Sequence, residues 1–118
     1  MSKSDHFQEA IDWAKSLSLS DFRANTEGYE SPHTFNQADK GLSFTPDMTG
    51  RRRTNKFYLE IALKTEEPRD TISKWKLMST LASMKGGKLY LLAPRGHKAY
   101  VERLRDEHQL PNTEVVAL

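Results

Sequence analysis

The sequence predicts an α/β domain in which helices flank a mixed sheet of four to five strands. Residues 57–64 place apolar side chains at every second position, which is typical of a β-strand. Residues 89–93 are continuously apolar, as in a strand that is covered on both faces. A helical pattern over residues 70–85 lies between these two strands, and strand–helix–strand order implies parallel pairing with a right-handed crossover.

An antiparallel hairpin is expected just before this unit. Residues 42–47 alternate in polarity and predict a half-buried strand, which Pro46 confines to an edge or a bulge. Residues 49–55, which read Thr-Gly-Arg-Arg-Arg-Thr-Asn, predict the hairpin loop. On the returning strand, one face carries Phe57, Leu59, Ile61 and Leu63, and the other carries Tyr58, Glu60, Ala62 and Lys64.

The remaining elements follow from helical periodicity and from turn residues. Residues 5–17 have an apolar helix face, and residues 18–40 are expected to be mostly loop with one short strand. Gly86-Gly87 should end the helix over residues 70–85. A second helix is expected over residues 97–108 and a short final strand over residues 114–118.

Length and composition exclude several classes of protein. The 118 residues make one domain spanning residues 1–118, and 36% of them are hydrophobic, so a disordered chain is not expected. There is no cysteine, which excludes disulfides, thiolate zinc sites and cysteine nucleophiles. No apolar run approaches the roughly 20 residues that span a bilayer, and no signal-peptide core is present. We therefore expect a cytoplasmic protein without a membrane partner.

Charge is distributed unevenly along the chain. Residues 1–50 hold 4 basic and 8 acidic side chains, whereas residues 51–118 hold 14 basic and 8 acidic ones. The basic second half is compatible with a phosphate-bearing partner, and equally with a solvated lysine-rich surface. The hairpin tip carries Arg51, Arg52 and Arg53, which repel one another, so a bound polyanion would stabilise them. A disordered, solvated tip is equally consistent with this sequence.

Two carboxylates are the strongest chemical signal. If the hairpin register keeps the apolar positions together, Asp47 and Glu60 fall on one face, opposite or diagonal to each other. They would then be close enough to bind one cation, and oxygen ligands suit Mg²⁺. The alternative is that Asp47, Glu60 and Lys64 form the wet face of a half-buried hairpin.

Three segments resemble the PD-(D/E)XK nuclease superfamily. They are Thr45-Pro46-Asp47-Met48-Thr49, the strand Tyr58-Leu59-Glu60-Ile61-Ala62, and the helix containing Lys74-Trp75-Lys76. The order helix, three strands, helix, strand over residues 5–93 is also similar to the core of that superfamily. The resemblance implies a restriction endonuclease-like core and hydrolysis of phosphodiester bonds in DNA or RNA with Mg²⁺ or Mn²⁺.

By this resemblance, Asp47 and Glu60 would bind the metal together with the carbonyl of Ile61. Glu9 and Glu30 are the candidate auxiliary acids, and each also has the sequence context of an ordinary exposed residue.

The catalytic lysine of the family would stand two residues after Glu60, where this chain has Ala62. Lys64 on the same strand face, or Lys76 on the following helix, is the expected substitute, with Lys74 as a further candidate. Lys74 is otherwise grouped with the three arginines as a residue that contacts nucleic acid.

Three hypotheses remain open from the sequence. The first is a metal-dependent nuclease. The second is a non-catalytic module of the same fold that binds nucleic acid or a protein, including a second copy of this chain as a homodimer, and the absence of a lysine at Ala62 favours it. The third is an unrelated α/β scaffold in which Asp47 and Glu60 do not converge.

Overall fold

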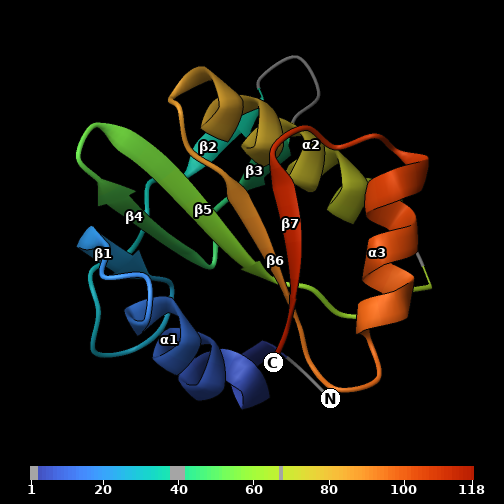
Figure 1. Ribbon diagram of the computed structural model, residues 1–118, viewed down its shortest axis with the longest axis horizontal. Coiled ribbons are helices and arrows are strands. Elements are labelled where there is room, and N and C mark those ends of the chain that lie inside the picture. The colour runs from blue at the N-terminus through green and yellow to red at the C-terminus, as the bar shows by residue number, and fades with distance from the viewer. Residues whose placement is uncertain (1–2, 38–41, 67) are drawn as a thin grey trace.

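A mixed five-stranded sheet forms the centre of the protein in the computed structural model, which describes residues 3–37, 42–66 and 68–118 (Figure 1). In spatial order, its strands are β1 (Ser20–Ala24), β4 (Met48–Arg52), β5 (Asn55–Ile61), β6 (Leu89–Ala93) and β7 (Thr113–Ala117). The first three strands pair antiparallel and the last three pair parallel. The predicted mixed α/β sheet is confirmed.

Helices cover both faces of the sheet, which gives three layers (Figure 1). The elements outside the central sheet are η1 (Lys3–His6), α1 (Phe7–Lys15), α2 (Pro68–Met84), α3 (Lys98–Glu107) and the two strands β2 (Phe35–Gln37) and β3 (Leu42–Phe44). Helix α1 packs on one face, while α2 and α3 pack on the other. The two-stranded β2–β3 sheet lies on the same face as α2, because the rings of Phe35 and Phe44 pack against the apolar cluster of that face.

Strand β5 divides its side chains between the two layers, as its alternation predicts. Phe57, Leu59 and Ile61 pack in the cluster beneath α1, and Tyr58 packs in the cluster beneath α2. Both faces of β5 are buried, and Glu60 lies on the buried face beneath α2 with no exposed surface. The expectation of a wet hairpin face is therefore wrong.

The hairpin differs from the expected one in its first strand. Residues 49–55 are mostly strand, since β4 occupies Met48–Arg52 and only Arg53 and Thr54 form the turn. Residues 42–44 form β3, which pairs with β2 in the separate small sheet and not with β5. Arg51 and Arg52 hid β4 from a polarity pattern, because their charged groups remain exposed while their backbone pairs with β5.

The segment predicted as loop over residues 18–40 contains two strands, β1 and β2. Strand β1 pairs with β4 through a register shift between Ser20 and Arg23. This irregularity breaks the alternation of apolar residues that a sequence pattern depends on. Residues 38–40 of the expected loop lie outside the described residues.

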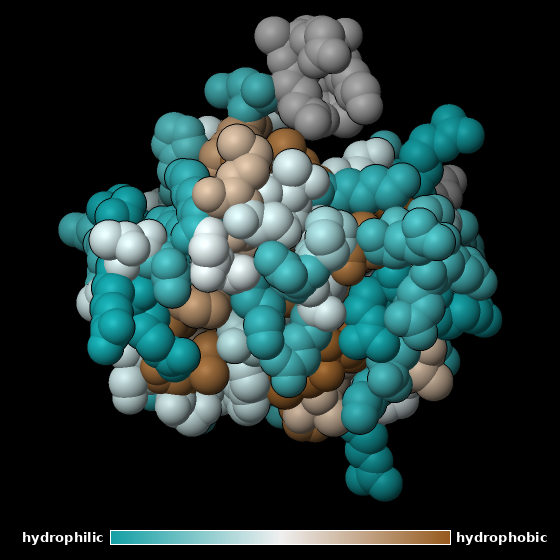
Figure 2. All heavy atoms as spheres, turned by 45° about the horizontal axis from the view of Figure 1, so that its top comes forward, coloured by the Kyte–Doolittle hydropathy of each residue, from teal (hydrophilic) through white to brown (hydrophobic). Residues whose placement is uncertain are grey.

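No helix in the described ranges is long and apolar enough to cross a membrane. On the face drawn in Figure 2, hydrophobic residues form small patches separated by hydrophilic side chains. Apolar burial in this protein is thus concentrated in the two clusters between the layers.

The end of α2 is fixed by two glycines, as predicted. Gly86 has a φ of 70°, in the left-handed region that favours glycine, and the N–H of Gly87 donates to the carbonyl of Ala82 at 2.8 Å. A Cβ atom on Gly87 would overlap the carbonyl oxygen of Lys56 on β5. The turn after α2 therefore sits directly against the hairpin that carries Glu60.

Replacing Gly87 with Ala should destabilise the protein by roughly 3 kcal/mol or more, because a backbone carbonyl cannot move aside cheaply. Gly96→Ala is the matched control, since Gly96 has a φ of 88° and open space around its Cα. That control should cost about 1–2 kcal/mol, the strain of a left-handed alanine. Urea unfolding of both variants measures the difference, and equal losses would mean that the contact with Lys56 is unimportant.

Candidate functional site

The β4–β5 hairpin brings Asp47 and Glu60 together. Met48 pairs with Leu59, so Asp47, the residue before β4, is next in register to Glu60. The backbone N–H of Asp47 donates to Glu60 Oε1 at 3.0 Å, and the N–H of Ile61 donates to Asp47 Oδ2 at 2.9 Å. Each carboxylate thus accepts a hydrogen bond from a backbone N–H that lies next to the other carboxylate. The convergence expected from the sequence is confirmed, although the strand before Asp47 does not pair with β5.

Both carboxylates are buried. Asp47 is 4% exposed and Glu60 is 0% exposed. Two like charges in a buried place repel each other and lose hydration, so they need cations close by.

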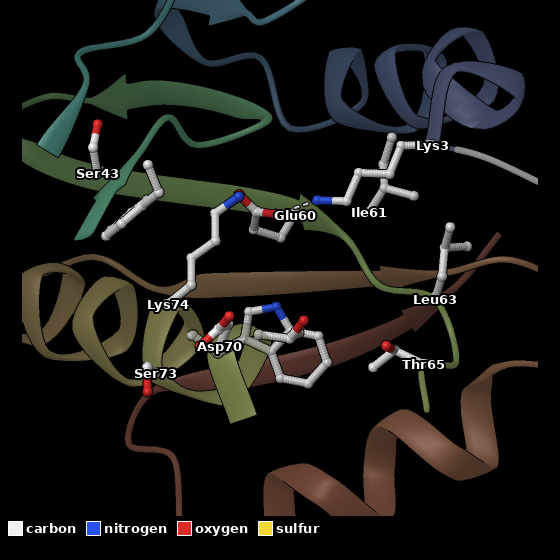
Figure 3. A pocket seen from close by; sticks show the side chains of 12 residues that line it. Lys3, Ser43, Glu60, Ile61, Leu63, Thr65, Asp70, Ser73 and Lys74 are labelled. Atoms are coloured by element: carbon white, nitrogen blue, oxygen red, sulfur yellow. Dashed lines mark hydrogen bonds and ion pairs between the residues drawn. The ribbon is translucent and has the colours of Figure 1, made fainter. Parts of the chain in front are cut away.

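Lys3 supplies the first cation, from the turn η1 at the start of the described chain. Its Nζ lies 2.9 Å from Asp47 Oδ2 and 3.0 Å from Glu60 Oε2. Figure 3 shows the Lys3 side chain extending toward Glu60, with a dashed line that marks their contact. One ammonium group therefore bridges the two carboxylates.

Lys74 supplies the second cation, from α2. Its Nζ lies 3.1 Å from Glu60 Oε1 and 5.6 Å from the centre of the Phe44 ring (Figure 3). The two lysines thus contact different oxygens of Glu60. Two carboxylates and two ammonium groups give the cluster a balanced formal charge when all four are ionised.

Burial and, after it, the neighbouring Asp47 carboxylate raise the pKa of Glu60 to about 7, against the opposing effect of Lys3 and Lys74. For Lys3, burial lowers the pKa, but the attraction of Glu60 and Asp47 outweighs it, so the pKa is raised overall. Lys3 therefore stays protonated at neutral pH, and Glu60 titrates there. A carboxyl that titrates near neutral pH is typical of a functional site.

A pocket of about 400 Å³ opens beside Glu60 and Lys74. Its walls combine the rings of Phe44 and Trp75 with polar side chains from β3, the segment after β5, and α2. The polar residues other than the charged cluster are Ser43, Thr65, Asp70, Thr71 and Ser73. The mixture of aromatic and hydroxyl groups next to charged residues is typical of a ligand pocket.

Lys64 and Lys76, the expected catalytic lysines, do not line this pocket. Strand β5 ends at Ile61, and the exposed Lys64 follows in a segment where its backbone N–H donates to His97 Nδ1 at 2.8 Å. Lys76 is exposed and lines a different pocket, together with Arg69 and His108. The placement of Lys64 on the strand face was wrong because the strand stops three residues earlier.

Glu9 and Glu30, the expected auxiliary acids, have other partners. Glu9 Oε1 lies 2.8 Å from His6 Nδ1, and Glu30 Oε2 lies 3.7 Å from Arg23 Nη2. Their side chains are 50% and 78% exposed, and neither lines the pocket beside Glu60.

Arg51, Arg52 and Arg53 lie at the other end of the hairpin. Arg52 pairs with Asn55 beside the turn, four residues and about 13 Å along β4 from Met48. All three are exposed; Arg52 Nη2 donates to the carbonyl of Leu17 at 2.6 Å, and Arg51 Nε lies 3.9 Å from Asp21 Oδ2. The expected basic tip exists, but it is separate from the carboxylates.

Lys3 is the site residue that sequence reasoning missed. An isolated lysine four residues before an apolar helix face carries no signal that distinguishes it from a solvated one. The sequence did indicate that Lys74 faces the sheet. Lys74 lies four residues before the buried Met78 and shares its helix face, whereas Lys76 lies two residues before Met78 and on the opposite side of the helix.

One observation indicates that the carboxylate pair can hold a divalent cation. An oxygen of each carboxylate already lies within 3.0 Å of a single cation, the Lys3 ammonium. Carboxylate oxygens suit Mg²⁺ and Mn²⁺. Within residues 3–37, 42–66 and 68–118, no three His, Cys, Asp or Glu side chains gather where they could hold a metal. Backbone carbonyls or water would complete the coordination.

The class that the fold defines is a mixed α/β domain whose central hairpin carries a buried carboxylate pair and two lysines. No protein-family model matches the chain, and neither a curated protein nor a solved structure matches it. What the domain does is therefore inferred from the chemistry of these four side chains.

Replacing Glu60 with Gln should remove a pH-dependent part of the stability. The pKa of Glu60 in the folded protein, about 7, lies above its ordinary value of 4.5, so the folded protein binds this proton more tightly than the unfolded chain does. The free energy of unfolding therefore contains a contribution from this proton. It is present in full below the ordinary pKa of the side chain and is lost as the pH rises through the pKa of Glu60 in the folded protein. Between these values, wild-type stability should fall by on the order of 2 kcal/mol more than that of Glu60→Gln.

Urea unfolding of both proteins at about pH 5 and about pH 8 measures this difference. Glu27 is exposed, so Glu27→Gln serves as the matched control and should keep the wild-type dependence on pH. If the free energy of unfolding of Glu60→Gln depended on pH as that of the wild type does, Glu60 would have the same pKa in the folded and unfolded protein.

Proposed function

We propose that this protein is a metal-dependent phosphodiesterase that cleaves DNA or RNA, with a restriction endonuclease-like core. The observation that carries the proposal is the convergence of Asp47 and Glu60, from two neighbouring strands, on a single cation. An antiparallel hairpin followed by a helix and a parallel strand supports the proposed core.

Asp47 and Glu60 would hold Mg²⁺ or Mn²⁺, with the carbonyl oxygen of Ile61 as a third ligand. The ion would supply polarisation of a phosphate oxygen and a lowered pKa of bound water. The N–H of Ile61 orients Asp47, and the N–H of Asp47 orients Glu60, so the two ligands are held in place before any ion arrives.

Lys74 takes the role for which the sequence offered Lys64 and Lys76. It reaches Glu60 from α2 and lines the pocket, so its ammonium group can stabilise negative charge that develops on a phosphate there. Ala62, at the position of the family's lysine, is fully buried and supplies no charge. A lysine from the helix would compensate for the alanine that directly follows β5.

The proposed substrate is a polyanion that extends across more than the pocket. Arg51, Arg52 and Arg53 would bind its backbone, with Arg51 and Arg52 about 13–17 Å along the hairpin from Asp47. A homodimer would enlarge the surface available to a duplex, and the proposed location is the cytoplasm.

Asp47→Asn should lose cleavage of nucleic acid in Mg²⁺ or Mn²⁺ by at least about a hundredfold, because the ion loses a charged ligand while the hydrogen bond from Ile61 is kept. Single-stranded and duplex DNA, and RNA, are assayed together, with EDTA as the metal control. Asp12, which pairs with Gln8 on the surface of α1, provides the matched variant Asp12→Asn, which should cleave like the wild type. Equal cleavage by wild type and Asp47→Asn would exclude a metal site at Asp47.

Lys74→Met should lower the cleavage rate by about a hundredfold, whereas the exposed Lys98 can be replaced by Met without loss. Lys76→Met separates the two lysines of the helix. If Lys76→Met lost as much activity as Lys74→Met, or Lys74→Met lost none, the assignment of this role to Lys74 would be wrong.

A second function is favoured by one observation. Lys3 neutralises the carboxylate pair without any metal, and with Ala62 in place of a lysine this describes a non-catalytic module that binds nucleic acid or a protein. In that case Asp47 and Glu60 are structural, and the exposed arginines of the hairpin tip carry the binding.

This second function predicts salt-dependent binding of DNA or RNA that survives both EDTA and Asp47→Asn. Replacing Arg51, Arg52 and Arg53 together with Gln should weaken the binding and reduce the slope of log K against log salt by about 2–3, since about one counterion is released per phosphate contact. Fluorescence anisotropy at several salt concentrations measures it. If the protein does not bind nucleic acid, or binds it without dependence on salt, the second function would be interaction with a protein.

A further inference from the structure

Lys3 contacts both carboxylates of the proposed metal site, and it does so through the oxygens that face each other. Its Nζ lies 2.9 Å from Asp47 Oδ2 and 3.0 Å from Glu60 Oε2. Magnesium binds oxygen at about 2.0–2.1 Å, so an ion held by these two oxygens would occupy the space of the ammonium group. The two cations would also repel each other, and only one of them can bridge the pair.

We propose that Lys3 is an internal competitor of the divalent cation, so that the ion binds only when the Lys3 side chain withdraws from Asp47 and Glu60. This inference rests on the proposed function, because it assumes that the carboxylate pair binds a divalent ion. It adds that the N-terminal turn η1 sets the affinity of the site for that ion.

The placement of Lys3 allows such an exchange. The turn η1 contains no buried residue, whereas the buried residues of α1 begin at Ala10, so η1 can shift without uncovering the core. The side chain of Lys3 is 39% exposed, which gives its ammonium group a route to solvent. His6, at the end of η1, is paired with Glu9 on α1. Withdrawal of the Lys3 side chain does not require this pair to break.

Lys74 is not a competitor of the same kind. It contacts Oε1 of Glu60, whereas Lys3 contacts Oε2, and no contact joins Lys74 to Asp47 among the described ion pairs. Lys74 can stay in place while Lys3 is replaced. A divalent ion in place of the Lys3 ammonium would change the cluster from electrically balanced to an excess of one positive charge, which suits a phosphodiester.

The test is the affinity for Mn²⁺ alone, measured from the electron paramagnetic resonance signal of the free ion. Lys3→Gln should lower the dissociation constant of Mn²⁺ by about tenfold or more. Lys15 at the far end of α1 is exposed, so Lys15→Gln removes the same charge where solvent screens it, and should stay within about twofold of the wild type. Binding by Lys3→Gln that is equal to or weaker than that of the wild type would overturn the proposal.

The two failures are distinguishable. If Lys3→Gln and the wild type bind Mn²⁺ equally, and Asp47→Asn abolishes binding in both, the metal site stands and competition by Lys3 is excluded. If Mn²⁺ binds to neither protein, the proposed metal-dependent function fails, and this inference fails with it.

A second measurement on the wild-type protein covers the case in which Lys3→Gln does not fold. An amine-reactive acetylating reagent modifies lysines according to the accessibility of the free amine, and mass spectrometry quantifies each site. Saturating Mg²⁺ should increase the modification rate of Lys3 severalfold and leave Lys15 unchanged. An unchanged or slower rate at Lys3, with the ion bound, would show that Lys3 stays on the carboxylates.

Discussion

Two carboxylates buried side by side are the constraint that the rest of this domain has to satisfy. Asp47 and Glu60 repel each other and are removed from water, which is costly unless cations and hydrogen-bond donors lie close to them. The hairpin provides two backbone N–H donors, η1 provides Lys3 and α2 provides Lys74. The two faces of the central sheet are thus connected through one charged cluster as well as through their apolar packing.

The strands and helices with regular patterns could be predicted from the sequence. The strand that carries Glu60, the helix after it and the parallel strand β6 are where the pattern places them, because burial alone dictates their periodicity. Strand β4 could not be predicted, since Arg51 and Arg52 form backbone hydrogen bonds to β5 while their charged ends stay in solvent. The proximity of Asp47 to Glu60 was predicted, but through a wrong register, because residues 42–44 pair with β2 and the contact comes instead from the pairing of Met48 with Leu59. The contact of Lys3 was not, because it depends on where the chain enters the fold.

The chemistry of the site follows from how its charges are shared. Glu60 is contacted by both lysines, each through a different oxygen, whereas of these two lysines only Lys3 contacts Asp47 among the described ion pairs. Glu60 is also the residue whose pKa burial moves towards neutrality. A pocket with aromatic walls lies directly beside these groups, and its charged lining residues are Lys3, Glu60, Asp70 and Lys74.

The sequence separations within the cluster bear on the order in which the chain can fold. Lys3 is 44 residues from Asp47 and 57 residues from Glu60, so its ion pairs are non-local contacts. During synthesis Lys3 emerges first, yet its anionic partners are absent until the hairpin has formed, and α2 follows later still. Non-local contacts form late because the intervening chain must be ordered first. The closed cluster consequently requires η1, the hairpin and α2 together, and a nascent chain that ends before α2 carries a carboxylate pair that is only half neutralised.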